Sequence, residues 1–226
     1  MTPWNLLDST AIPAGGGELR LYQRGEEFSI MIAGGGELMN TRMHGSEDAL
    51  AELACISVAQ RPHPRVLIGG LGMGFTLAAA LKQLGPEAEV VVAELVPAVV
   101  EWNHGPLGAH AGYPLDDHRT RVRVGDVAEI IRAEKSAFDA IMLDVDNGPE
   151  GLTHSENDWL YSPAGLHAAY AALRPEGVLA VWSAGGDRAF SERLRETGFQ
   201  VEERQVRAHA KGKGARHTIW LAMRDG

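Results

Sequence analysis

Hydrophobic positions follow one pattern in the first 45 residues and another in the rest of the chain. Two copies of the sequence AGGGEL, at 14–19 and 33–38, enclose short strand-like runs around a turn at 24–26. Runs bounded by glycine-rich corners predict a small β-meander over 18–41. A phosphate-binding triple glycine would open a helix, and neither copy precedes a clear helix start, so turns are the favoured interpretation.

From Ser46 onward, short apolar strands alternate with amphipathic helices. Ser46 is placed to cap the first helix, which extends to about Gln60. The predicted strands are 65–70, 89–95, 121–126, 138–146 and 178–184. The predicted helices lie at 73–85, from Pro97 onward, and at 128–136, 163–177 and 187–197. The segments 199–206 and 216–223 form a predicted antiparallel pair. Such alternation indicates a parallel sheet with helices on both faces.

Composition narrows the classes of protein to which the chain can belong. Of its 226 residues, 45% are hydrophobic, and 21 basic against 30 acidic side chains give a net charge of −9. The hydrophobic fraction supports a folded core, and the acidic balance argues against nucleic-acid binding as the main function. The sequence shows no apolar run of membrane-spanning length and no signal-peptide pattern, and its single cysteine favours a cytoplasmic protein.

The segment 204–217 groups basic side chains with glycine and alanine. It has two interpretations, a solvated hairpin loop or a binding site for an anion such as an RNA phosphate. The segment contains no Phe, Tyr or Trp for stacking and the chain is acidic, so the hairpin loop is favoured.

Glycines follow the first strand of the alternating region in the run Gly70-Leu71-Gly72-Met73-Gly74. They permit a tight turn and let a ligand lie against the backbone near the positive end of the next helix dipole. The spacing differs from the G-x-G-x-x-G of dinucleotide-binding loops, so the glycines alone are a weak signal.

Acidic residues end the next three strands. Glu94 comes 20 residues after Gly74, where a carboxylate can accept hydrogen bonds from both ribose hydroxyls. Asp126 follows the third strand, where an acceptor can hold the exocyclic amine of adenine, and Asp144 ends the fourth. Ligands of open α/β sheets bind at the carboxyl ends of the strands, so this pattern predicts a nucleoside-binding site. The alternative is that the glycines only make turns and the acids only cap helices.

These motifs resemble the spermidine synthase family of aminopropyltransferases, a branch of the class I S-adenosylmethionine-dependent methyltransferase fold. The resemblance extends from about residue 27 to 184 and rests on RVLIGGLGMGFTLAAALK, VVAEL, VGD, FDAIMLDVD and LYSPAGLHAAYAALRPEGVLAVWSA. It implies an α/β fold with a Rossmann-like seven-strand methyltransferase-type sheet. We expect a small N-terminal β-meander at 1–45 and the transferase-like domain at 46–226. The resemblance also implies S-adenosylmethionine or its decarboxylated form as cofactor, a small amine acceptor, and a homodimer or tetramer.

Asp144 and Asp146 are the candidate catalytic residues. Asp144 matches the first aspartate of the family's Asp-Ser-x-Asp-Pro motif, which the resemblance implies to be catalytic, and Asp146 lies on the same loop edge. Alkyl transfer from a sulfonium is an in-line displacement, so the protein has to hold an uncharged nucleophile and supply a base. Asp144 can act on the acceptor amine or bind the amino group of the cofactor, and the sequence leaves both roles open.

The loop 147–161 is a predicted lid over the acceptor. Its candidate substrate-contacting residues are Glu150, Glu156, Asp158 and Tyr161. A metal held by His154 and the neighbouring acids is the alternative, but their spacing is not typical of a metal site, and we expect no metal.

Two positions depart from the family's pattern. Met73 stands where the resemblance implies an aspartate that anchors the aminopropyl amine, and Glu47-Asp48 stand where the family has Tyr followed by Gln or His. A thioether cannot pair with an ammonium group, and the lost negative charge makes the carboxylate of intact S-adenosylmethionine easier to accommodate. The sequence therefore slightly favours methyl transfer. Aminopropyl transfer is the first alternative, and a non-catalytic nucleoside-binding protein is the second.

Overall fold

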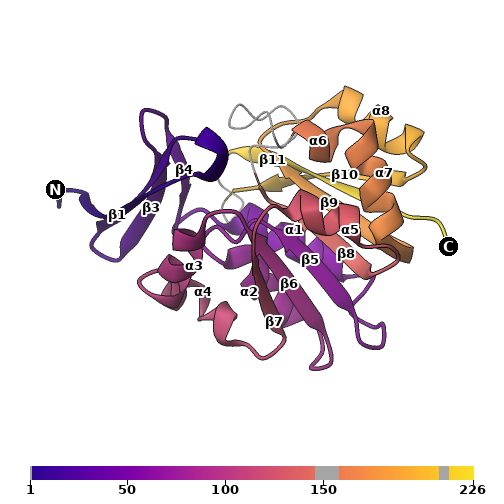
Figure 1. Ribbon diagram of the computed structural model, residues 1–226, viewed down its shortest axis with the longest axis horizontal. Helices are drawn as coiled ribbons and strands as arrows, with labels where there is room; N and C mark the ends of the chain where they lie inside the picture. Colours follow the sequence, from indigo (N-terminus) through magenta and orange to yellow (C-terminus); the bar gives the residue numbers. More distant parts are fainter. Residues whose placement is uncertain (1, 146–157, 209–213) are drawn as a thin grey trace.

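The computed structural model describes residues 2–145, 158–208 and 214–226. Its chain forms two β-sheets, a four-stranded antiparallel sheet near the N-terminus and a seven-stranded sheet covered by helices (Figure 1). The predicted fold class, a seven-strand α/β sheet preceded by a small antiparallel β-structure, is confirmed.

The N-terminal sheet has the strand order β1-β2-β3-β4. The predicted meander corresponds to β2 (Glu18–Arg24), β3 (Glu27–Ile32) and β4 (Glu37–Asn40). β1 (Asn5–Ala11) is an additional strand that pairs antiparallel with β2. The sequence did not predict it because its residues are nearly all exposed, so no alternation of apolar and polar side chains marks it.

The large sheet has the strand order β10-β11-β9-β8-β5-β6-β7. Its parallel strands are β5 (Arg65–Gly69), β6 (Glu89–Glu94), β7 (Thr120–Val124), β8 (Phe138–Leu143) and β9 (Leu173–Ser183). The predicted terminal pair is the antiparallel hairpin of β10 (Gln200–Arg207) and β11 (Arg216–Met223). The order of strands reverses between β5 and β8, and a crevice beyond the carboxyl ends of two such strands is the usual binding place in open α/β sheets.

Helices cover both faces of the large sheet (Figure 1). α1 (Gly45–Cys55), α2 (Phe75–Gln83) and α3 (Pro97–His104) pack on one face, and α5 (Val127–Ala133), α7 (Pro163–Ala172) and α8 (Arg188–Glu196) pack on the other. Along β5, Val66 and Ile68 belong to the first core and Leu67 to the second, as the two-residue period of a strand requires. Shorter elements are α4 (Gly108–Ala111), α6 (Asp158–Tyr161) and the 3-10 turns η1 (Pro13–Gly15) and η2 (Pro114–Asp116). None of the described helices is long and apolar enough to span a membrane.

Several element boundaries differ from the prediction, and two of the differences have a structural consequence. α1 begins at Gly45 and ends at Cys55, so Ser46 lies inside the helix, buried, and does not cap it. β9 begins at Leu173, inside the predicted helix 163–177, because Leu173 already pairs with Phe138 of β8. The pairing of neighbouring strands therefore sets where this helix ends.

Apolar packing and one polar contact hold the N-terminal sheet against the larger one. Leu19, Phe28 and Ile30 belong to the same core as α1, α2 and α3. Trp102 of α3 donates a hydrogen bond from its indole Nε1 to Asp8 Oδ2 of β1 at 2.7 Å. The small sheet is thereby fixed beside the glycine-rich turn that follows β5.

Candidate active site

The turn between β5 and α2 contains Gly70, Gly72 and Gly74, all with positive φ angles. A Cβ atom at Gly70 would overlap the carbonyl oxygen of Asp144, so only glycine lets this turn lie directly against the end of β8. Gly74 is the N-cap of α2. The Asn103 amide donates a hydrogen bond to Gly72 O at 2.8 Å, which fixes the turn from the α3 side. A ligand can approach this backbone near the N-terminus of α2.

Glu94, at the end of β6, holds this turn through one carboxylate oxygen and the start of α3 through the other. The backbone N–H of Leu71 donates to its Oε2 at 2.9 Å, and that of Val96 donates to its Oε1 at 2.8 Å. Burial raises the pKa of Glu94, and the hydrogen bonds from backbone N–H groups oppose that rise. Each carboxylate oxygen has a further lone pair, so Glu94 can still accept from two adjacent hydroxyls.

Asp126 caps α5, and its carboxylate accepts a hydrogen bond from the backbone N–H of Ala128 at 2.8 Å. A carboxylate retains further acceptor capacity after one such bond. The same side chain also lines a cavity with Glu94. Capping a helix and accepting from a ligand are thus compatible roles for this residue.

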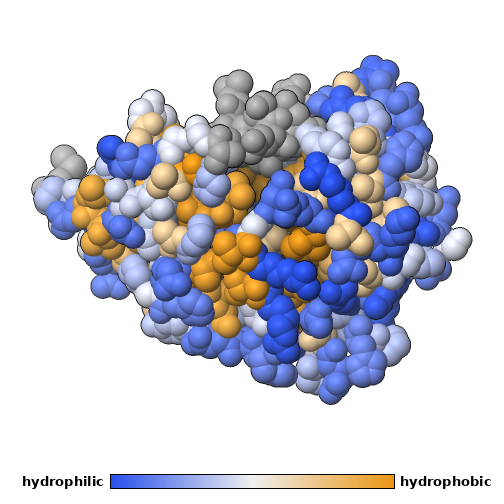
Figure 2. Space-filling model, in the orientation of Figure 1, coloured by the Kyte–Doolittle hydropathy of each residue, from blue (hydrophilic) through white to orange (hydrophobic). Residues whose placement is uncertain are grey.

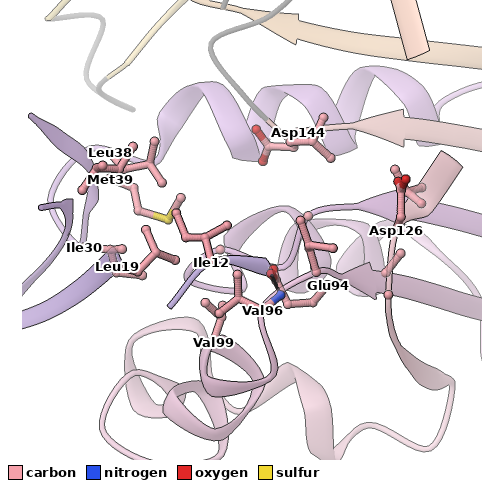
Figure 3. A pocket seen from close by; sticks show the side chains of 18 residues that line it. Ile12, Leu19, Ile30, Leu38, Met39, Glu94, Val96, Val99, Asp126 and Asp144 are labelled. Atoms are coloured by element: carbon pink, nitrogen blue, oxygen red, sulfur yellow. Dashed lines mark hydrogen bonds between the residues drawn. The ribbon is translucent and has the colours of Figure 1, made fainter. Parts of the chain in front are cut away.

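The cavity beside the glycine turn, which we call the glycine-loop cavity, has one polar and one apolar wall. The polar wall consists of Gly70, Gly72, Glu94, Asp126 and Asp144. The apolar wall comes largely from the N-terminal sheet and the start of α3, and includes Ile12, Leu19, Ile30, Ile32, Leu38, Met39, Val96 and Val99. Figure 3 shows Glu94, Asp126 and Asp144 around one side of the cavity and the apolar side chains of Leu19, Ile30, Leu38 and Met39 on the other. Hydrophobic residues also gather on the surface between the two sheets (Figure 2).

A second cavity, which we call the α1 cavity, adjoins the first. The two cavities share the lining residues Leu38, Met39, Gly72, Asp144 and Val145. The polar and aromatic part of the α1 cavity consists of Glu37, Asn40, Ser46, Glu47, Phe75, Thr76, Trp182 and His217. Neither cavity has a Lys or Arg among its described lining residues. The carboxyl groups of Glu37, Glu47 and Asp144 in the α1 cavity favour a cationic ligand over an anionic one.

The carboxyl groups of Glu47 and Asp144 influence each other's ionisation. Thr76 Oγ1 donates to Asp144 Oδ2 at 2.7 Å, and Ser46 Oγ donates to Glu47 Oε2 at 2.7 Å. Burial, and after it the charge of Asp144, raises the pKa of Glu47 to about 7. Burial raises the pKa of Asp144 to about 6, against the hydrogen bond from Thr76. Two carboxyl groups with raised pKa values in one cavity are typical of a proton-transfer site.

Trp182 of β9 and His217 of β11 form another part of the α1 cavity wall. His217 Nδ1 lies 2.9 Å from Ser46 Oγ, and the two aromatic rings pack edge-on with centroids 4.7 Å apart. Burial lowers the pKa of His217, which favours its neutral form. The Trp182 indole Nε1 is buried without a hydrogen-bond partner among the described residues.

Most of the predicted cofactor residues lie together. Gly70, Gly72, Glu94, Asp126 and Asp144 line the glycine-loop cavity. Gly74 is not among the lining residues of this cavity, and it is the N-cap of α2.

Of the predicted lid residues, only Tyr161 has a described side chain. Tyr161 lines neither cavity: it is 5% exposed and packs edge-on against Phe190, in the core beneath α7 and α8. Asp146, Glu150 and Glu156 lie outside the described residues, and Asp158 is described only by its backbone, as the start of α6. The ring of Tyr161 completes an apolar core, and a role of this residue in the lid stays a prediction.

Ser46, Trp182 and His217 were not predicted as site residues, and Glu47 was noted only as a departure from the family pattern. The contact between Ser46 and His217 joins residues 171 positions apart. No local motif marks such a contact, because it exists only when α1 packs against the C-terminal hairpin. One local signal was present, two acids at the start of a helix, but it is equally typical of ordinary helix ends.

Comparison with known proteins gives one match in sequence. No protein-family model matches the chain. A curated polyamine aminopropyltransferase from Thermotoga petrophila is 32% identical over 127 residues. The chain is similar to polyamine aminopropyltransferases. The match takes in 56% of this chain and 41% of the relative, so the chain spans about two fifths of the length of the curated protein it matches.

Solved structures extend the likeness to the fold. A spermidine synthase in complex with the transition state analogue AdoDATO has a TM-score of 0.74 at 18% identity, covering 96% of this chain and 72% of that one. An O-methyltransferase from Streptomyces achromogenes in complex with SAM has a TM-score of 0.56 at 20% identity, covering 80% of each chain. The predicted resemblance to the spermidine synthase family is confirmed, together with the methyltransferase-type fold.

Proposed function

We propose that the protein transfers an aminopropyl group from decarboxylated S-adenosylmethionine to a small amine. The observation that carries this proposal is the meeting of two cavities at Asp144, one of them suited to a nucleoside and the other lined by carboxylates. The sequence match to a polyamine aminopropyltransferase supports the same reaction class.

The glycine-loop cavity would hold the adenosyl part of the donor. In this assignment Glu94 accepts from the ribose hydroxyls, Asp126 accepts from the adenine amine, and the backbone around Gly72 lies beside the remainder of the donor. When bound, the donor supplies a sulfonium-activated carbon. The apolar wall from the N-terminal sheet would keep water away from that carbon.

The α1 cavity would hold the amine acceptor. Asp144 lines both cavities, so it is the group best placed to orient a nitrogen toward a carbon in the first cavity. Glu47 and Glu37 add negative charge on the acceptor side. Asp146 stays a candidate catalytic residue, and Glu150, Glu156 and Asp158 stay candidate lid residues. Their side chains lie outside the part of the chain that the structure describes.

The sequence favoured methyl transfer because Met73 replaces an acid in the glycine turn. Met73 is buried and lines the α1 cavity, and Glu47 lines the same cavity. Glu47 therefore adds a carboxyl group on the acceptor side of the turn, where Met73 supplies none. Intact S-adenosylmethionine would bring its carboxylate toward these acids, with no Lys or Arg among the described lining residues to balance it. This charge pattern, and the named relative, favour aminopropyl transfer over the methyl transfer that we expected.

A turnover assay separates these reactions and also tests the non-catalytic alternative. The purified protein would be incubated with labelled S-adenosylmethionine or its decarboxylated form and a panel of mono-, di- and triamines. We expect label from the decarboxylated donor in an amine product, with release of a neutral thioether nucleoside. Methylated product instead would overturn the aminopropyl assignment, and the absence of product from either donor would leave only nucleoside binding.

Two further predictions stay untested, a cytoplasmic location and assembly as a homodimer or tetramer. Light scattering during size-exclusion chromatography would measure the oligomeric state. A monomer would contradict that prediction.

A further inference from the structure

Glu47 and Glu37 line the α1 cavity only, whereas Asp144 lines both cavities and so lies next to the space that a sulfonium donor would fill. Both carboxylate oxygens of Glu37 already accept hydrogen bonds, from Ser29 and Asn40. A positive charge beside a carboxyl group favours the ionised form of that group. An occupied donor cavity would therefore keep Asp144 charged, and the charged Asp144 would increase the proton affinity of Glu47, on the far side from the donor.

Neighbouring side chains hold Glu47 in position. Ser46 donates from Oγ to Glu47 Oε2 at 2.7 Å, and Ser46 itself lies 2.9 Å from His217 Nδ1. With the Ser46 proton directed to Glu47, the His217 Nδ1–H donates to Ser46 Oγ, which leaves Nε2 as the other ring nitrogen of a neutral imidazole. His217 is in turn packed against Trp182. Ser46 and His217 act through Glu47 and are positioning residues.

On this geometry we propose that Glu47 is the base that takes the proton from the acceptor amine, while Asp144 remains ionised and orients it. The inference rests on the proposed aminopropyl transfer. In that reaction the carbon–sulfur bond of the donor breaks and its electron pair stays on sulfur. The acceptor nitrogen forms the new bond to the carbon with its lone pair. An amine that enters as an ammonium ion first loses one proton, and the carboxylate of Glu47 accepts it.

The ionisation of Glu47 suits this task. Its pKa is raised to about 7 by burial and by Asp144. The other titratable groups around it are Asp48 on the same helix, which pairs with His44, His217 beyond Ser46, and Glu37 across the same cavity. An alkyl ammonium group titrates at about 10, as a lysine does, so the two ionisations are well separated. The limb near 7 of a pH–rate profile would therefore report Glu47, and the ionisation of Asp144, whose pKa is raised to about 6, would appear as a separate limb at lower pH.

The test compares pH profiles of kcat/KM for the acceptor at saturating decarboxylated donor. The variants are Glu47→Gln, Glu47→Asp and, as the control, Glu52→Gln, which removes an exposed acid from the same helix. We expect the wild-type profile to rise through an ionisation near 7. Glu47→Gln should lose this limb and about 100-fold in kcat, the lower range for a general base. Glu47→Asp should regain part of the rate and keep a limb, and Glu52→Gln should match wild type.

Calorimetric titration with the donor accompanies each profile, and unchanged affinity in Glu47→Gln shows that the variant is folded and binds its cofactor. A Glu47→Gln variant that keeps the wild-type limb and rate would overturn the role of Glu47 and leave the proposed function standing. The same holds if Glu47→Gln loses affinity for the donor in step with its rate, since Glu47 would then be part of the donor site. A wild-type protein without turnover would instead overturn the proposed function, and the role of Glu47 with it.

Discussion

The glycine-loop cavity and the α1 cavity meet at Asp144, but their walls are formed by different parts of the chain. The first is shaped on its polar side by backbone and by acids at strand ends, such as Glu94, whose oxygens accept from two backbone N–H groups. The second is assembled from side chains of β4, α1, α2, β9 and β11. One is a product of the sheet topology, and the other depends on how separate elements pack around it.

This difference implies a division of functions. A cavity fixed by backbone suits the adenosyl part, which S-adenosylmethionine and its decarboxylated form have in common. A cavity made of side chains can vary without disturbing the sheet, so it would set the acceptor and the group transferred. In this chain the α1 cavity contains Met73 and Glu47, which depart from the pattern of the similar family. These two residues decide the charge that a donor tail or an amine would meet.

The largest effect is expected where the cavities meet. Asp144→Asn keeps the size of the side chain and removes its charge, so the amine would lose its orienting carboxylate. We expect kcat to fall by about 100-fold or more, while donor affinity measured by calorimetry stays within about threefold, the pattern of an interaction made with the acceptor. Weaker donor binding would instead assign Asp144 to the cofactor, and unchanged affinity with unchanged turnover would contradict both roles.

A smaller effect should be confined to the glycine-loop cavity. Glu94→Gln replaces one acceptor oxygen by an amide that faces a backbone N–H donor, and it removes the charge offered to the ribose. We expect donor affinity to fall by about 10- to 100-fold, which corresponds to about 1.4 to 3 kcal/mol. Glu89→Gln on the same strand is the matched control, because Glu89 is partly exposed and pairs with Arg65 at the surface. Equal affinities in the two variants would remove Glu94 from the site.

The smallest effect is expected from the hydrogen bond that Ser46 donates to Glu47 in the α1 cavity. The Ser46 hydroxyl lowers the pKa of Glu47, against the larger effects of burial and Asp144. Ser46→Ala removes that hydrogen bond, so the pKa of Glu47 should rise and the acid limb of the pH–rate profile should move to higher pH. At saturating pH the rate should change by less than about tenfold. A limb that stays in place, or moves to lower pH, would show that Ser46 does not act on the ionisation that controls the rate.

The same contrast explains how much the sequence predicted. The residues Gly70, Gly72, Glu94, Asp126 and Asp144 were found from their places after strands, because parallel strands bring their carboxyl ends to one edge. Most strands and helices of the large sheet were found in the same way, from their periodicity. Boundaries such as the start of β9 were missed, since cross-strand pairing with β8 overrides the local helical pattern.

The α1 cavity could not be predicted in this way. Ser46 was interpreted as a helix cap, but the register of α1 turns it inward toward Glu47 and His217. Tyr161 was assigned to the predicted lid as the last residue of the loop 147–161, and the structure places its ring in the core against Phe190. Both outcomes depend on which elements pack together, and neither the composition nor the spacing of residues contains that information.

The proposed function requires this chain to bind a sulfonium nucleoside whose tail lacks a carboxylate. Calorimetric titration of the wild-type protein with decarboxylated S-adenosylmethionine, and separately with the intact molecule, measures this preference. The charge of the α1 cavity predicts tighter binding of the decarboxylated form by about tenfold or more, equivalent to about 1.4 kcal/mol. Equal or tighter binding of intact S-adenosylmethionine would contradict aminopropyl transfer, and binding of neither would contradict the assignment of the glycine-loop cavity itself.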